Sequence, residues 1–218
     1  MDIDIMNELV IWAERLIGND AVVSKEKYGD QSSVYGLRVP TGDFFLKIGK
    51  DLSKEHERLE WLDEKLPVPK VIGFTRIRDD DALLLSAMPG KNLGELKKEW
   101  PAEKVVDALV VALRRFHAVD VSDWPFGPTD DGVLVHGDAC LPNFIFNDGG
   151  LSGYIDLGEM MVGDPEADLA AAVWSLHYNL GPGYGSMFLE RYGAKNVTDE
   201  YVEALRRRYE GMQQSWGL

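Results

Sequence analysis

The chain has 218 residues, of which 45% are hydrophobic and 28% are charged, so a packed core is expected and intrinsic disorder is excluded. Its 37 acidic and 23 basic residues give a formal charge of -14, which disfavours nucleic acid and anionic lipid as partners. A single cysteine, no bilayer-length apolar run and no basic secretory signal make the cytoplasm the expected location.

The first half of the sequence predicts one helix followed by a mainly β region. Ile5, Leu9 and Leu16 recur at helical spacing before Gly18 ends the run. Strands are expected at 21–28, 34–39 and 44–48, with turns at 29–33 and 41–43 between them. Ser53 is placed to cap a helix that ends before Pro67, and two further strands are expected at 71–77 and 82–86.

The second half predicts mostly helices after a linker at 88–92. Apolar residues share one helical face between 105 and 116, and short buried strands are expected at 133–135, 144–146 and 154–155. Further helices are expected from 164 and at about 186–192 and 199–213. The linker predicts two domains, a nucleotide-binding β lobe at 1–88 and a catalytic, acceptor-binding lobe at 89–218.

One stretch carries the spacing of a kinase catalytic loop. Asp138 is followed five residues later by Asn143, and an apolar segment then leads into Asp156. Phosphoryl transfer needs an acceptor that aligns the attacking hydroxyl, and hard oxygen ligands that hold magnesium against the phosphates. We therefore interpret Asp138 as the catalytic residue and Asn143 and Asp156 as Mg²⁺ ligands. His136 is interpreted as a structural residue beneath this loop.

The same hypothesis requires a lysine and a glutamate upstream to hold the phosphates. Lys47 lies inside an apolar strand, and both Glu55 and Glu57 lie early in the helix that follows. Spacing alone leaves the choice between the two glutamates open. The turn at 29–33, which includes Ser32 and Ser33, is a candidate cover for the phosphates.

These residues resemble the aminoglycoside phosphotransferases, particularly the aminoglycoside 3′-phosphotransferase (kanamycin kinase) group. The resemblance covers most of the chain. Its most specific blocks are His136-Gly137-Asp138 and the run from Gly153 to Gly158. It implies an α+β, protein-kinase-like bilobal fold, with a small N-terminal β lobe and a larger, mostly helical C-terminal lobe.

The resemblance also implies roles for single residues. Glu55 lies six residues before Trp61, as the family's lysine-pairing glutamate does, and is chosen over Glu57. Ser86 and Met88 match the hinge positions whose backbone holds the adenine. Asp164 and Asp168 match an Asp-x-x-x-Asp pattern after the metal loop.

The sequence departs from the family on the acceptor side. About twenty residues separate Phe116-His117 from His136, too few for the helical insertion that usually supplies much of the acidic antibiotic-binding wall. Glu159 stands where the family is commonly basic, and the family's acidic C-terminal ending is not recognisable. We therefore expect a more open acceptor site with a broad or shifted acceptor range. Acidic candidates for binding a cationic acceptor are Asp130, Asp131, Glu159, Asp164 and Glu166.

Together these observations predict an enzyme that moves the γ-phosphate of ATP (or GTP), with Mg²⁺, to a hydroxyl of a small cationic molecule. The leading acceptor is an aminoglycoside antibiotic, so the enzyme would confer antibiotic resistance. The alternatives are a kinase for a small alcohol such as choline, ethanolamine or homoserine, and a catalytically silent nucleotide-binding module. The expected assembly is a monomer or homodimer.

Overall fold

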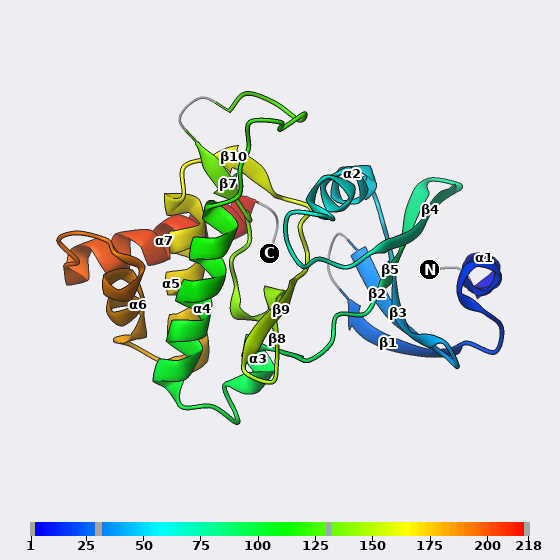
Figure 1. Ribbon diagram of the computed structural model, residues 1–218, viewed down its shortest axis with the longest axis horizontal. Helices are drawn as coiled ribbons and strands as arrows, with labels where there is room; N and C mark the ends of the chain where they lie inside the picture. Colours follow the sequence, from blue (N-terminus) through cyan, green and yellow to red (C-terminus); the bar gives the residue numbers. More distant parts are fainter. Residues whose placement is uncertain (1–2, 29–31, 130–131, 216–218) are drawn as a thin grey trace. The chain divides into compact units, whose positions relative to one another are not determined.

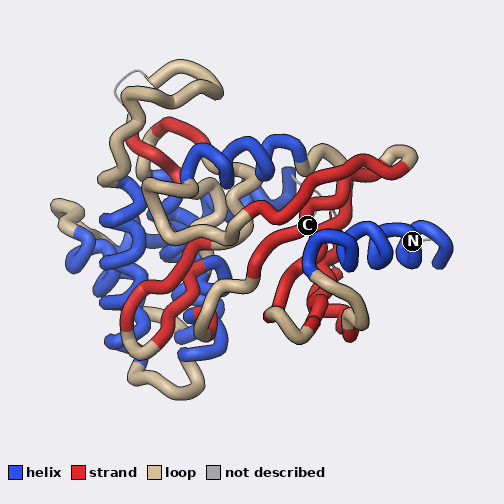
Figure 2. The backbone as a smooth tube through the Cα atoms, turned by 45° about the vertical axis from the view of Figure 1, so that its right-hand side comes forward, coloured by secondary structure: helices blue, strands red, loops and turns tan. Residues whose placement is uncertain are grey.

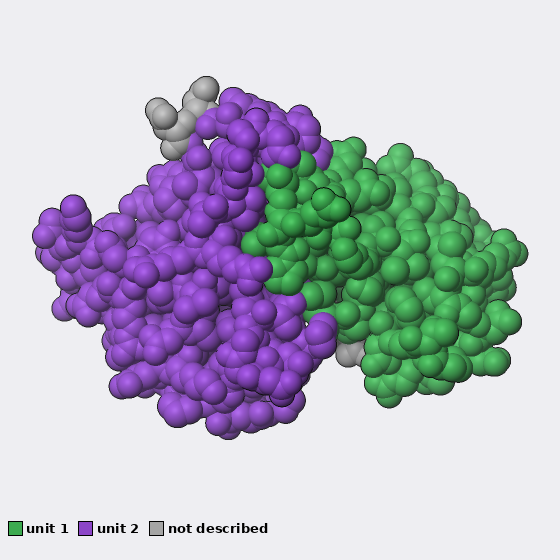
Figure 3. Space-filling model, in the orientation of Figure 1, with its two compact units in different colours: residues 1–88 green, residues 89–218 purple. Residues whose placement is uncertain are grey.

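In the computed structural model, which describes residues 3–28, 32–129 and 132–215, the chain divides into two units. Unit 1 comprises residues 1–88 and unit 2 comprises residues 89–218 (Figure 3). Strands dominate unit 1 and helices dominate unit 2, as the colouring of Figure 2 shows. The chain is therefore α+β, as the sequence predicts.

Unit 1 is built on one antiparallel sheet of five strands with the order β1-β2-β3-β5-β4 (Figure 1). Its elements in chain order are α1 (Ile3–Ile17), β1 (Val22–Tyr28), β2 (Ser32–Val39), β3 (Gly42–Gly49), α2 (Ser53–Leu62), β4 (Val71–Ile77) and β5 (Asp80–Ser86). Strands β3 and β5 pair although α2 and β4 separate them in sequence. This crossover places β3 in the middle of the sheet.

The alternation of side chains along β3 decides which residues face each helix. Leu46 and Ile48 belong to the core that α1 closes, which also contains Leu9 and Leu84. Because successive strand side chains point to opposite faces, Lys47 lies on the other face of the sheet. That face carries α2, so the sequence alternation itself directs the lysine toward this helix.

Unit 2 is a helical body with two small sheets. Its elements are β6 (Lys91–Asn92), α3 (Leu93–Leu96), α4 (Ala102–His117), β7 (Val133–Val135), the 3₁₀ turn η1 (Leu141–Asn143), β8 (Phe144–Asn147), β9 (Gly150–Tyr154), β10 (Met161–Gly163), α5 (Glu166–Leu180), α6 (Tyr184–Tyr192) and α7 (Asp199–Ser215). Strand β8 pairs with β6 and β9, and β7 pairs with β10. Across the described ranges, no helix has both the length and the apolar character that crossing a bilayer requires.

Helix α5 is the centre of unit 2. It packs against α4, α6 and α7 (Figure 1), and consecutive residues from Asp168 to Val173 are buried. A helix that is apolar on every side is expected to be enclosed by its neighbours. Because its neighbours enclose α5, the carboxylate of Asp168 in its first turn is held in a fixed position. The candidate site described below depends on that position.

Several predicted boundaries differ from the structure. The short elements β6, α3 and β10 were not predicted, because two to four residues carry no periodic signal. Ser32 and Ser33, predicted as part of a turn, belong to β2, where they pair with Gly49 and Ile48. The rest of that predicted turn, 29–31, lies outside the described residues.

The prediction that Ser53 caps α2 is wrong. The cap position is Leu52, and it has no side-chain cap hydrogen bond. The carboxylate of Asp81, a buried residue of β5, instead accepts the Leu52 backbone N–H at 2.9 Å. Arg76 donates to the other Asp81 oxygen at 2.7 Å. A long-range carboxylate thus replaces the local hydroxyl, and only the tertiary fold brings it there.

Asp81→Asn is expected to lower the free energy of unfolding by about 2 kcal/mol, because a charge-assisted cap and its arginine partner are weakened together. The hydrogen bond from Arg76 lowers the pKa of the Asp81 carboxyl. The stabilisation is therefore present at neutral pH and is lost as the pH falls through the folded-state pKa. Urea unfolding at neutral and acidic pH measures both effects.

The exposed turn residue Asp79 provides the matched control for Asp81. Asp79→Asn should leave stability within about 0.5 kcal/mol of wild type at both pH values. An Asp81→Asn protein whose deficit is the same at neutral and acidic pH would contradict the assigned ionisation.

Candidate active site

The loop between β7 and β8 holds the residues of the predicted catalytic stretch close together. Asn143 ends the turn η1, and its side-chain Nδ2 donates to both Asp138 O and Asp138 Oδ2 at 2.8 Å. Asn143 is buried, whereas Asp138 is half-buried. The five-residue spacing in the sequence therefore closes a compact loop that presents one carboxylate at its surface.

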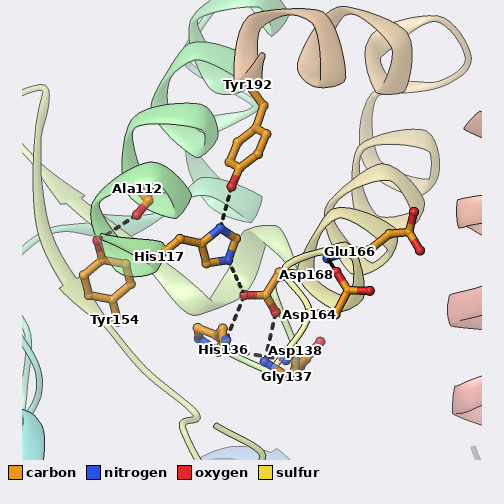
Figure 4. A network of polar contacts seen from close by, with 10 residues as sticks. All are labelled: Ala112, His117, His136, Gly137, Asp138, Tyr154, Asp164, Glu166, Asp168 and Tyr192. Carbon is orange, nitrogen blue, oxygen red and sulfur yellow. Dashed lines mark hydrogen bonds and ion pairs between the residues drawn. The ribbon is translucent and has the colours of Figure 1, made fainter. Parts of the chain in front are cut away.

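A buried carboxylate from α5 accepts hydrogen bonds from the backbone of this loop (Figure 4). Asp168 Oδ2 accepts the His136 N–H at 2.7 Å, and Asp168 Oδ1 accepts the Gly137 N–H at 2.9 Å. His117 Nε2 donates to Asp168 Oδ2 at 2.9 Å, and His117 Nδ1 lies 2.7 Å from the hydroxyl of Tyr192. The network joins α4, α5, α6 and the loop through one carboxylate.

Gly137 is the point at which the loop requires glycine. Its φ is +85°, in the left-handed region, and a Cβ built there would lie 2.5 Å from the carbonyl oxygen of Glu159. The backbone of Glu159 therefore passes directly against the residue that precedes Asp138. Any larger residue would push the loop away from Asp168.

His136 fits the structural role predicted for it. Its ring is fully buried between Phe116 and Phe144, with ring centroids 5.5 Å away in both cases. The Asp138 N–H donates to His136 Nδ1 at 3.3 Å. The imidazole therefore supports the backbone of the loop from its buried side.

A backbone hydrogen bond joins the segments that carry Asn143 and Asp156. Ile155 N donates to Asn143 O at 3.0 Å, so Asp156 follows directly on the residue paired with Asn143. Tyr154, at the end of β9, donates to Ala112 O in α4 at 2.9 Å (Figure 4). Asp156 has φ +62°, a conformation that non-glycine residues adopt rarely and that often marks a functional position.

The chemistry of these two residues fits Mg²⁺. Asn143 uses its amide nitrogen on Asp138, and its amide oxygen Oδ1, like the carboxylate of Asp156, is a hard ligand of the kind that Mg²⁺ prefers. In the described part of the chain, no group of three or more His, Cys, Asp or Glu residues is placed to hold a metal. Mg²⁺ is commonly held by one or two carboxylates together with substrate phosphates and water, so the pair suits it.

In unit 1 the structure brings Lys47 and Glu55 together. Lys47 Nζ lies 2.6 Å from Glu55 Oε2, and their side chains are 13% and 4% exposed. Glu57 is exposed on the same helix, so the structure separates the two glutamates that spacing could not. Burying the Glu55 carboxylate beside the half-buried Lys47 costs less free energy when the two charges are paired.

Four further predicted nucleotide-binding residues belong to unit 1, three of them on strands of the same sheet. Ser32 and Ser33 begin β2, opposite the end of β3 that contains Lys47. Ser86 ends β5, where its N–H donates to Lys70 O at 3.0 Å and its Oγ accepts from Lys70 N at 2.9 Å. Met88 is the last residue of unit 1.

The acidic residues predicted to face the acceptor are not equivalent. Glu159 is exposed beside Gly137. Asp164 is also exposed and accepts the Glu166 N–H at 2.9 Å at the start of α5. Glu166 is already engaged, because Arg208 lies 2.5 Å from Oε2 and the Tyr201 hydroxyl 3.1 Å from Oε1. Asp130 and Asp131 lie outside the described residues.

A pocket of about 300 Å³ opens beside the start of α5. Asp164, Glu166, Tyr192 and Tyr201 are among the residues that line it. Tyr192 also bonds to His117, so the pocket lies against the network that supports the loop.

Tyr209 is the residue of the site that the sequence did not indicate. Its hydroxyl lies 2.6 Å from Asp138 Oδ1, although 71 residues separate the two in sequence. The only local signal is that Tyr209 follows Leu205 at helical spacing, and both are buried. That pattern predicts a core residue and says nothing about its hydroxyl.

The connection between α4 and β7 is short, as the sequence predicts. Residues 118–129 and 132, the described part of this connection, contain no helix. The helical insertion expected of the family is therefore absent from these residues.

Comparison with known proteins places the chain among phosphotransferases. The sequence model of the phosphotransferase enzyme family matches residues 29–127 and 122–209, two segments that meet within the short connection. An aminoglycoside 3′-phosphotransferase of Escherichia coli is 29% identical over 237 positions, which cover 85% of this chain and 84% of the relative. The aligned 85% of this chain amounts to about 185 residues, so about 52 of the 237 alignment positions are gaps in this chain.

Solved structures show the same fold. The crystal structure of an aminoglycoside 3′-phosphotransferase of type VIII superposes with a TM-score of 0.74 at 24% identity, covering 94% of this chain and 98% of that one. A phosphotransferase of Streptomyces rimosus, solved with ADP and streptomycin, has a TM-score of 0.64 at 21% identity and covers 94% and 96% of the two chains.

Asp168→Asn is expected to lower the free energy of unfolding by about 3 kcal/mol, since an amide NH₂ would face N–H donors that now reach a buried carboxylate. Denaturant unfolding measures the change. Asp164→Asn is the matched control and should change stability by less than about 0.5 kcal/mol, because asparagine caps a helix as well as aspartate does. Equal stability of the two variants would contradict the central role of Asp168.

Proposed function

Since the chain belongs to the phosphotransferase enzyme family, we propose that it transfers the γ-phosphate of ATP to a hydroxyl group of an aminoglycoside. The observation that carries this proposal is the loop geometry, in which Asn143 fixes a half-buried Asp138 carboxylate. The relatives named above are aminoglycoside phosphotransferases, which supports this class of acceptor.

In the proposed reaction Asp138 accepts the proton of the attacking hydroxyl. The acceptor oxygen forms a bond to the γ-phosphorus, and the bond between that phosphorus and the oxygen bridging to ADP breaks. The proton that leaves the hydroxyl moves to the Asp138 carboxylate. Asp138 also aligns the attacking hydroxyl with the γ-phosphorus, because the rate of transfer depends on an in-line approach.

The residues that bind the nucleotide in this proposal belong to unit 1. Lys47, half-buried and oriented by Glu55, would bind the α- and β-phosphates, and the backbone at Ser32 and Ser33 would cover them. Ser86 contributes its carbonyl to the adenine, because its N–H is already used by Lys70, and Met88 contributes its N–H. Asn143 and Asp156 would hold Mg²⁺, which would supply positive charge against the charge that develops on the phosphates.

The segments proposed to bind the acceptor indicate an open site. The described residues between α4 and β7, 118–129 and 132, form no helical wall, and Arg208 pairs with Glu166. Glu159 and Asp164 are the carboxylates in position to attract an ammonium group on the acceptor. These observations also favour a second candidate, a small amino alcohol such as choline, ethanolamine or homoserine, which needs no extended wall.

Asp138→Ala is expected to lower kcat by about a hundred- to ten-thousand-fold, because the variant loses the proton acceptor. Nucleotide affinity should remain, since Asp138 does not hold the phosphates. The measurement is transfer from labelled ATP to a panel of aminoglycosides and amino alcohols, with mass detection of the product. Turnover near the wild-type rate would show that the role belongs to another group.

Glu55→Gln is expected to raise the KM for ATP about tenfold, because Lys47 loses the charge that orients it. Glu57→Gln makes the same chemical change two residues away, on an exposed position of the same helix, and should leave KM unaltered. Steady-state kinetics at varied ATP concentration separates them. If both variants raised KM equally, the effect would come from the helix and not from the buried pair.

A further inference from the structure

The side chain of Asp138 has a second partner besides Asn143, and it comes from α7. Tyr209 is 2% exposed, and its ring packs on Trp174 with centroids 5.3 Å apart. Its hydroxyl reaches Asp138 Oδ1 at 2.6 Å, a distance typical of a hydroxyl donating to a charged oxygen. Asn143 Nδ2 holds the other oxygen, Oδ2, at 2.8 Å. Each carboxylate oxygen is therefore tied to one donor.

The direction of the hydrogen bond from Tyr209 follows from the chemistry of its partners. An ionised carboxylate only accepts hydrogen bonds, so the Tyr209 hydroxyl donates its proton to Asp138. The Cys140 Sγ lies 3.4 Å from the same hydroxyl, and its S–H can donate to the remaining lone pairs of that oxygen. Burial raises the pKa values of both the Cys140 thiol and the Tyr209 phenol, so both keep their protons.

The placement of these donors leaves part of Asp138 available. A carboxylate has about four lone-pair sites, and the two donors described here use one on each oxygen. Tyr209 is buried while Asp138 is half-buried, so the hydroxyl reaches the carboxylate from the protein side. One sp²–sp³ torsion sets the plane of a carboxylate, and a donor on each oxygen fixes that torsion.

We propose that Tyr209 is a positioning residue for phosphoryl transfer, whose hydroxyl fixes the plane of the Asp138 carboxylate so that the acceptor hydroxyl meets it in line with the γ-phosphate. This inference rests on the proposed function. It assigns to α7, far from the loop in sequence, a direct part in setting the catalytic geometry. Small misplacements of a reacting group lower rates strongly, so the loss of one hydroxyl should be measurable.

Tyr209→Phe removes the hydroxyl and keeps the ring against Trp174. It is expected to lower kcat about 10- to 100-fold, while the KM for ATP stays within about twofold of wild type and Tm is unchanged. Tyr178→Phe is the matched control: this ring also stacks on Trp174, at 5.3 Å, but the residue is 74% exposed. Tyr178→Phe should keep the wild-type kcat.

Three results would overturn the inference. They are a wild-type kcat in Tyr209→Phe, a loss that disappears when rates are normalised to the folded fraction, and a higher kcat, which would mean that the hydroxyl competes with the acceptor. If the wild type phosphorylates no acceptor in the panel, the proposed function fails separately. The same variants are then compared by ATP hydrolysis, in which water is the acceptor, and a wild type that does neither contradicts both proposals.

Discussion

The hydrogen bonds accepted by the buried carboxylate of Asp168 are the interaction on which the rest of unit 2 depends. It has no exposed surface, and it accepts two backbone N–H groups of the loop and one from His117. A buried carboxylate is costly unless hydrogen bonds satisfy it, so the fold that encloses α5 requires the loop to lie against it. The same contacts fix the backbone that leads into Asp138. The charge therefore stabilises the fold and sets the position of the candidate catalytic residue at once.

Much of the fold and part of the site follow from local patterns in the sequence. The period of two along β3 sends Lys47 to the face opposite Leu46, and the helical spacing of α2 brings Glu55 into reach. Contacts made across long separations could not be predicted in this way. Asp81 caps α2 from 29 residues away, and Tyr209 reaches Asp138 across 71 residues. Their sequence signals, a polar residue near a turn and an aromatic residue on an apolar helix face, occur in most proteins and specify no partner.

The residues proposed for phosphoryl transfer follow the family pattern more closely than the segments proposed for acceptor binding. Within unit 1, Lys47 Nζ lies 2.6 Å from Glu55 Oε2, and within unit 2, Asn143 Nδ2 donates to the Asp138 carboxylate, which are the pairings that the proposed transfer requires. On the acceptor side, the described part of the connection after α4 has no helix, and Glu166 is bound by Arg208. Phosphoryl transfer depends on charged groups in fixed positions, so the residues that supply them tolerate few substitutions. Acceptor binding can change with the length of a surface segment. These differences support the proposal of phosphoryl transfer with a broad or shifted acceptor range.

Phosphorus-31 NMR of the protein with Mg²⁺, ATP and an aminoglycoside tests the central claim most directly, because it distinguishes transfer to an alcohol from transfer to water. We expect the γ-phosphate signal to decrease while a phosphomonoester signal grows at the same rate, with little inorganic phosphate. If inorganic phosphate alone accumulated with every aminoglycoside and amino alcohol, or if the ATP signals did not change, the chain would not be the phosphotransferase proposed here.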